Sequence, residues 1–110
     1  MIVLVAAMAL HLTGSAPAGQ ERAAFVYNPQ TARGTPLVCA DVTEKGFGDA
    51  ELWVTGFVSG MNAATYQMVG HTTTTSGLLG EVKLYCASHP SDRLMNAVFQ
   101  TYERMKAAGK

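Results

Sequence analysis

The sequence has little charge, and its two signs cancel. Its 110 residues include eight basic and eight acidic side chains, so the formal net charge at neutral pH is zero. A nucleic-acid or anionic-membrane partner requires a basic excess, and this balance argues against both. Acid removes the balance: once every carboxylate is protonated, the Lys and Arg side chains together with His71 and His89 leave the chain strongly cationic.

The sequence also lacks an apolar run of the roughly 20 residues that cross a bilayer. The uncharged run over residues 2–10 is far shorter, and an A-x-A-type cleavage site follows it at residues 16–18. We therefore predict a signal peptide over residues 1–18, cut after Ala18, and a periplasmic mature protein without a membrane span. No Lys or Arg precedes the run, so an uncleaved anchor or a buried strand is the alternative.

Motifs of catalysis and metal binding are missing. The sequence has no H-E-x-x-H, no phosphate-binding glycine loop, no G-x-S-x-G and no C-x-x-C. Cys86 is followed by His89, but Pro90 disfavours helical geometry at that histidine. His71 lies in a threonine-rich loop without an acidic neighbour. We therefore expect no enzymatic activity, no catalytic residue, no metal site and no cofactor.

Cysteine is scarce, with Cys39 and Cys86 alone. An even count in an exported chain of this size favours a disulfide over free thiols. Two ligands of a metal site are the rival interpretation, but the spacing typical of such sites is missing. We predict a Cys39–Cys86 disulfide that ties the beginning of the folded domain to a later helix.

Hydrophobic periodicity predicts an all-α protein. An extended arm is expected over residues 19–36 and a helical domain over residues 37–110. A short helix opens the domain, with Thr35 as its N-cap and Pro36 at its first position. No alternating pattern typical of strands follows residue 40.

Three longer helices complete a small disulfide-stapled bundle. The first begins after the N-cap Asp49, runs to about Gln67 or Met68, and is stopped by Gly70. The second spans about residues 76–87, and the third follows the cap Ser91. The third helix is expected to bury one face, comprising Leu94, Ala97, Val98, Thr101, Tyr102 and Met105.

Two glycines, Gly56 and Gly60, lie four residues apart inside the first long helix, where each costs roughly 1 kcal/mol relative to alanine. The pair matches the G-x-x-x-G pattern of membrane helix pairs, but its charged and polar flanks exclude a membrane span. We predict that both glycines allow close packing of a neighbouring helix. A self-association or partner face is the alternative.

The apolar residues of the same helix recur at helical spacing, and we expect Trp53, Phe57 and Met61 to fill the core. If this face is ever uncovered, it would bind an unfolded client or a protein partner. The predicted binding residues are Trp53, Val54, Phe57, Val58 and Met61.

Three segments resemble the HdeA/HdeB family of small periplasmic acid-stress proteins. They are "CAD" at residues 39–41, the W-x-x-G-[aromatic]-x-x-G helix from Trp53 to Gly60, and "YCASHP…LMNAV" over residues 85–98. The resemblance covers about residues 37–105. It implies an HdeA-like all-α fold with one disulfide between the two cysteines. It also implies an ATP-independent chaperone, dimeric near neutral pH, which in acid exposes apolar surface to unfolded periplasmic proteins.

A weaker resemblance is to Tai-type immunity proteins of type VI secretion. These are small, exported and helical, and they carry a glycine–aromatic helix followed by an "hP" segment. The resemblance implies inhibition of a periplasmic peptidoglycan amidase. The cysteine positions favour the first family, because the second is expected to have cysteines soon after the glycine helix and at the C-terminus. A structural or accessory periplasmic domain is the third hypothesis.

Overall fold

The computed structural model describes residues 29–31 and 34–110, and in these ranges the chain forms four helices and no strand. The helices are α2 (Cys39–Lys45), α3 (Ala50–Thr65), α4 (Thr75–Ala87) and α5 (Leu94–Ala107). The predicted all-α class, a small bundle with a disulfide, is confirmed. The predicted signal peptide and residues 19–28 of the predicted arm lie outside the described residues.

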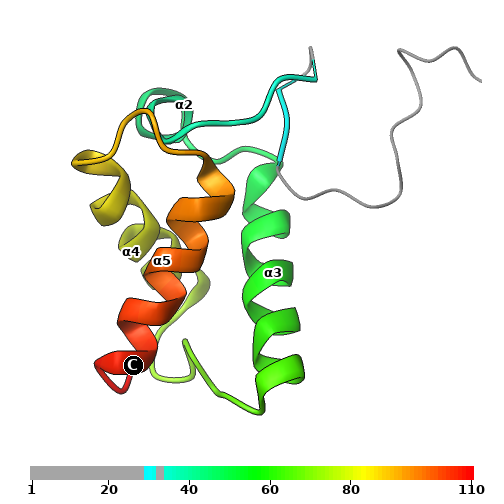
Figure 1. Ribbon diagram of the computed structural model, residues 1–110, viewed down its shortest axis with the longest axis vertical. Helices are drawn as coiled ribbons and strands as arrows, with labels where there is room; N and C mark the ends of the chain where they lie inside the picture. Colours follow the sequence, from blue (N-terminus) through cyan, green and yellow to red (C-terminus); the bar gives the residue numbers. More distant parts are fainter. Residues whose placement is uncertain (1–28, 32–33) are drawn as a thin grey trace, which may run out of the picture.

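The helices surround one core. Helices α4 and α5 lie side by side, α2 crosses one end of this pair, and α3 stands beside α5 on the other side (Figure 1). Every helix contributes to the buried set, so no element folds as a separate unit. The core comprises Cys39, Val42, Phe47, Ala50, Val54, Val58, Val69, Leu78, Val82, Cys86, Leu94, Ala97, Val98, Tyr102 and Met105.

The predicted start of the first helix is wrong. Helix α2 begins at Cys39, because Pro36 and Leu37 are held in an extended segment: Pro36 bridges Gln30, and the Leu37 N–H donates to the Pro29 carbonyl at 2.8 Å. The extended N-cap residue is Val38, whose N–H donates to the Asp41 carboxylate. This aspartate, three residues into the helix, pairs the N–H of the N-cap residue, whereas the first-turn capping bond expected of Thr35 is made by no side chain at Val38.

Helix α3 begins after Asp49 as predicted, but the aspartate side chain makes no capping hydrogen bond. The helix ends at Thr65, earlier than predicted, and Gly70 is not its stop. The terminating residue is Tyr66, which adopts the left-handed conformation at φ 56°. A non-glycine residue rarely adopts this conformation, so the contacts on either side of Tyr66 must hold it there.

Helices α4 and α5 follow the prediction closely. Helix α4 starts one residue early, after Thr74, whose hydroxyl accepts the Gly77 N–H at 3.1 Å. Helix α5 starts at Leu94 rather than directly after Ser91, so residues 88–93 form the turn between the two helices. The predicted buried face of α5 is confirmed at all six positions.

Thr101 is a fully buried polar side chain, and its hydroxyl has no hydrogen-bond partner among the described residues. We expect Thr101→Val to raise the free energy of unfolding by about 1 kcal/mol, because an unpaired buried hydroxyl is unfavourable and valine fills nearly the same volume. Urea denaturation at neutral pH measures the change. Thr55→Val is the control, since that half-buried hydroxyl donates to the Glu51 carbonyl, and no gain is expected there. Lower stability of Thr101→Val would contradict this account.

Among the described helices, none is both long and apolar enough to span a membrane.

Candidate functional site

Helix α3 is almost free of charge on every side. Its one charged residue is Glu51 in the first turn, and the sequence from Leu52 to Gly80 contains no Asp, Glu, Lys or Arg. A helix that is apolar all round is normally covered all round. Here the buried residues of α3 are Ala50, Val54 and Val58, which lie along one side of the helix.

The opposite side faces away from α4 and α5 in Figure 1. We call this side the outer face of α3, defined as Leu52, Gly56, Ser59, Gly60 and Ala63, all of which are exposed. Leu52 is 81% exposed, and the other four residues of this face are small and uncharged. Two apolar side chains that follow the helix are also exposed: Tyr66 by 94% and Met68 by 69%. Exposed large apolar side chains are a feature of interaction sites.

Two aromatic rings flank the outer face. Trp53 and Phe57 stack with their ring centroids 5.2 Å apart, and both are half-buried. With Met61 they pack against the edge of the core, and Val54 and Val58 occupy its interior. The expectation that Trp53, Phe57 and Met61 fill the core is therefore met only in part, because they line its edge and leave its interior to the two valines. The aromatic and methionine residues and the two valines both recur at helical spacing. The spacing alone therefore could not decide which of the two groups would be buried.

The predicted role of the glycine pair in packing within the chain is wrong for the described residues. Gly56 and Gly60 are both exposed, and a Cβ atom added to either would meet nothing within 4 Å. Neither glycine has a positive φ, so backbone conformation does not require them. The alternative interpretation, a self-association or partner face, stays a prediction.

A polar cluster fixes the end of α3. The Asn62 side chain accepts the Val69 N–H at 3.0 Å and donates to the Val69 carbonyl at 2.9 Å. The hydroxyl of Tyr102, which is 1% exposed, donates to Asn62 at 2.9 Å and lies 3.2 Å from the Thr65 hydroxyl. The cluster therefore joins α3 both to the following loop and to α5. It accounts for the left-handed turn between Thr65 and Val69.

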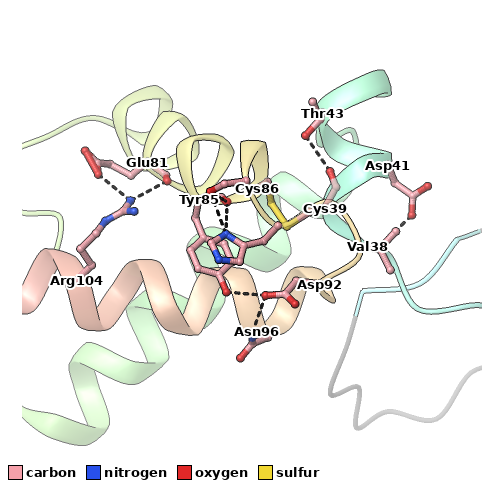
Figure 2. The surroundings of a disulfide bond; sticks show 12 residues. Val38, Cys39, Asp41, Thr43, Glu81, Tyr85, Cys86, Asp92, Asn96 and Arg104 are labelled. Atoms are coloured by element: carbon pink, nitrogen blue, oxygen red, sulfur yellow. Dashed lines mark hydrogen bonds and ion pairs between the residues drawn. A yellow bond between two sulfur atoms is a disulfide. The ribbon is translucent and has the colours of Figure 1, made fainter.

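The predicted disulfide is confirmed. Cys39 and Cys86 are bonded, with their Cα atoms 4.9 Å apart, and both side chains are buried. Figure 2 shows the bond joining the start of α2 to the end of α4. Because Cys86 is consumed in this bond, it is not a thiol nucleophile for His89. The histidine ring instead stacks on Tyr85, with centroids 4.0 Å apart.

Next to the disulfide, the carboxylate of Asp92 gathers side chains from α4 and α5 (Figure 2). It accepts the Tyr85 hydroxyl at 2.5 Å and the Asn96 amide at 3.0 Å. The Tyr85 bond is the main reason why the pKa of Asp92 lies below its ordinary value of 3.8; Asn96 and nearby His89 act in the same direction, against desolvation. The same bond raises the pKa of the Tyr85 hydroxyl. Sequence analysis missed this cluster, which joins residues seven apart across a turn.

A pocket of about 310 Å³ lies beyond the end of α3, with Tyr66 and His71 among its lining residues. The His71 Nδ1 atom is 2.7 Å from the Met68 carbonyl, so its other ring nitrogen is left for solvent. Two lysines also line the pocket, and each pairs with a glutamate: Lys106 with Glu103, and Lys110 with Glu81. The pocket thus carries no strong chemical preference of its own.

Sequence reasoning missed the most exposed residues of the candidate site, namely Leu52, Ser59, Ala63, Tyr66 and Met68. One signal in the sequence could have found them. Residues 52–80 lack charge altogether, although charged residues make up 15% of the whole chain. A long uncharged segment that contains one helix must leave uncharged surface on that helix wherever the bundle does not cover it.

Comparison with known proteins adds no relative from which a role could be transferred. The site is therefore defined by its own geometry, as an exposed, uncharged helix face with two glycines at its centre and two stacked aromatic rings at its flank. The chain matches no family model, no curated protein and no solved structure.

Proposed function

We propose that this protein is a periplasmic, ATP-independent, acid-stress chaperone-like protein that binds unfolded clients through apolar helix faces. The observation that carries the proposal is the outer face of α3, which is exposed, free of charge and bears the apolar side chain of Leu52. Unfolded chains present apolar side chains without a fixed shape, and an exposed face of small residues beside aromatic and methionine side chains suits such a ligand. An HdeA-like fold belongs to the same proposal.

Acid would enlarge this binding surface. Protonation of the carboxylates leaves the chain with like charges that repel one another, and the bundle loosens. Val54 and Val58, which we predicted as binding residues, are buried at the inner side of α3. They become available to a client only when α3 separates from the core. Trp53, Phe57 and Met61 lie at the edge of the core and require less rearrangement.

The test is the aggregation of an acid-denatured client enzyme at about pH 2–3, with and without the purified protein. Light scattering is expected to fall when the protein is present in several-fold molar excess. No suppression at that excess would overturn the proposal.

The residues are tested with a matched pair of lysine variants. Leu52→Lys places a charge on the outer face of α3, and lysine keeps this charge in acid, which glutamate does not. Leu84→Lys is the control, because Leu84 is 64% exposed on α4, away from that face. We expect weaker suppression by the first variant and unchanged suppression by the second. Equal behaviour of the two would remove the outer face from the proposal.

A second candidate function, inhibition of a periplasmic type VI secretion amidase, is favoured by one observation. The outer face is already exposed in the folded protein, so a folded partner could dock without any acid step. This alternative expects a stable complex at neutral pH with an amidase encoded by a neighbouring gene. Loss of that complex in Leu52→Lys, but not in Leu84→Lys, would favour it over chaperoning.

The two glycines provide a prediction that separates stability from binding. Gly56→Ala and Gly60→Ala are each expected to raise the free energy of unfolding by about 0.5–1 kcal/mol, because alanine favours the helix and its Cβ meets no neighbour. Both are also expected to weaken client or partner binding, since a Cβ keeps another backbone further away. Gly80→Ala in α4 is the control, because it is equally exposed and unobstructed. It should raise stability and leave binding unchanged.

A further inference from the structure

The turn between α4 and α5 holds the first residues of α2. The N–H groups of Cys39 and Ala40 have no acceptor inside their own helix, as is general for the first turn. They donate instead to carbonyls of the turn, Cys39 to Asp92 at 2.7 Å and Ala40 to Pro90 at 2.9 Å. The position of the turn thus decides whether these two donors stay paired.

The turn itself is fastened by the side chain of Asp92. Its carboxylate accepts Tyr85 from α4 and Asn96 from α5, so both neighbouring helices are bonded to one residue of the turn (Figure 2). A further bond, from the Leu94 N–H to the Leu37 carbonyl, continues the connection toward the segment before α2. Asp92 therefore connects three helices. Its carboxylate binds side chains of α4 and α5, and its backbone carbonyl accepts the Cys39 N–H at the start of α2.

We propose that Asp92 is an acid-sensitive latch whose protonation releases the start of α2 from the turn between α4 and α5 before the rest of the fold opens. A carboxylate accepts hydrogen bonds more strongly than a neutral carboxylic acid does. When Asp92 takes up a proton, the bonds from Tyr85 and Asn96 weaken and the turn gains freedom. The carbonyls of Pro90 and Asp92 then leave the N–H groups of α2.

The direction of the pH effect follows from the lowered pKa of Asp92. A carboxyl whose pKa is lower in the folded state stabilises the fold above its unfolded-state pKa, and this stability is lost as the pH falls through the folded-state value. The latch is thus closed at neutral pH and opens below the ordinary aspartate value of 3.8. Among the described residues, the titratable groups that act on the carboxylate are Tyr85 from α4 and His89 from the turn.

Opening would uncover a defined part of the core. Val42 on α2 and Phe47 just after it are buried, and they belong to the same core cluster as Leu94 at the start of α5. The disulfide keeps α2 attached to α4 throughout, so the opening is local and reversible. The inference rests on the proposed function, because the Asp92 latch would supply the acid trigger that exposes apolar surface.

The test is amide hydrogen exchange of the full mature protein by NMR, without any client. The protection factors of Cys39 and Ala40 are compared with those of Val98 and Tyr102 in α5, between neutral pH and about pH 2. In the wild type, the ratio of the first pair to the second is expected to fall about fivefold in acid, reflecting weaker bonds to an uncharged acceptor. A constant ratio would mean that α2 opens only with the whole fold, and would overturn the proposal.

Two variants connect the effect to the carboxylate. Asp92→Asn resembles the protonated state, so its ratio should already be about fivefold lower at neutral pH and should not change further in acid. Asp49→Asn is the control, because that side chain makes no capping bond, and the wild-type profile is expected. If Asp92→Asn fails to fold, Tyr85→Phe serves instead, and it should move the opening toward higher pH.

His89→Gln separates the latch from the neighbouring histidine. The acid loss of protection at Cys39 and Ala40 should persist in this variant. Its disappearance would place the sensor at His89 and contradict the assignment to Asp92. None of these readouts depends on chaperone activity, so a failed aggregation assay and a failed latch remain distinguishable.

Discussion

Breaking the Cys39–Cys86 bond is expected to lower the free energy of unfolding by about 4 kcal/mol, the largest effect of any change proposed for this chain. The bond closes a loop between residues 47 positions apart. In the chain-entropy account, a loop of this length restricts the unfolded chain by about that amount. Domains of this size have only about 5–15 kcal/mol in total. The reduced protein is therefore expected to have only a small free energy of unfolding left.

Urea denaturation of the oxidised and the reduced wild-type protein measures this effect without a change in sequence. The double variant Cys39→Ala/Cys86→Ala is the second measurement. Its free energy of unfolding should fall somewhat further, because both side chains are buried and the smaller alanines leave a cavity. The order in which segments are lost is also informative: α2 is short and joined to the bundle mainly at α4, so it should lose protection first. A difference below about 1 kcal/mol between oxidised and reduced protein would contradict the prediction.

Asn62→Ala is expected to destabilise the fold by about 2–3 kcal/mol. The substitution removes two hydrogen bonds to the Val69 backbone and one from the buried Tyr102 hydroxyl. Buried partners that lose their hydrogen bonds cost more than the bonds themselves contributed. The end of α3 should also fray, which raises amide exchange around Tyr66.

The Asn62 prediction is checked by a double-mutant cycle with Tyr102→Phe, measured by urea denaturation. Tyr102→Phe alone should cost about 1 kcal/mol, and the two changes together less than their sum, because they remove the same bond. Gln67→Ala, an exposed polar residue in the same loop, is the control and should change stability by less than about 0.5 kcal/mol. Strict additivity of Asn62→Ala and Tyr102→Phe would contradict the described bond.

The parts of the fold that were predicted from the sequence are those fixed by local physics. Helix α5 has a polar side and an apolar side, so its buried residues could be named. Helix α4 has a threonine cap at its start and a proline after its end. The disulfide needed only the count of cysteines and the predicted export of the chain. For the two helices, the deciding residues lie within the segment itself or directly beside it.

The parts that were not predicted depend on contacts between distant segments. Pro36 has the residue type of a helix start, but its bridge to Gln30 keeps it extended. Helix α3 has apolar residues on several sides, and only the positions of α4 and α5 decide that Val54 rather than Phe57 lies inside. The same cause explains the glycines: their spacing indicated a close approach, while the bundle placed them on the outside.

The disulfide closes residues 39–86 into a covalent ring, which the described residues before Cys39 precede and a tail, residues 87–110, follows. Helix α3 lies within the ring and α5 within the tail, and the Tyr102–Asn62 bond is one of the contacts between them. An opening that moves α5 away from α3 while the bond stays intact separates tail from ring, and it uncovers part of the inner side of α3 while the residues of α3 stay on a closed loop. To refold, such a chain needs only to redock its tail, so its return to the native state should be fast and repeatable.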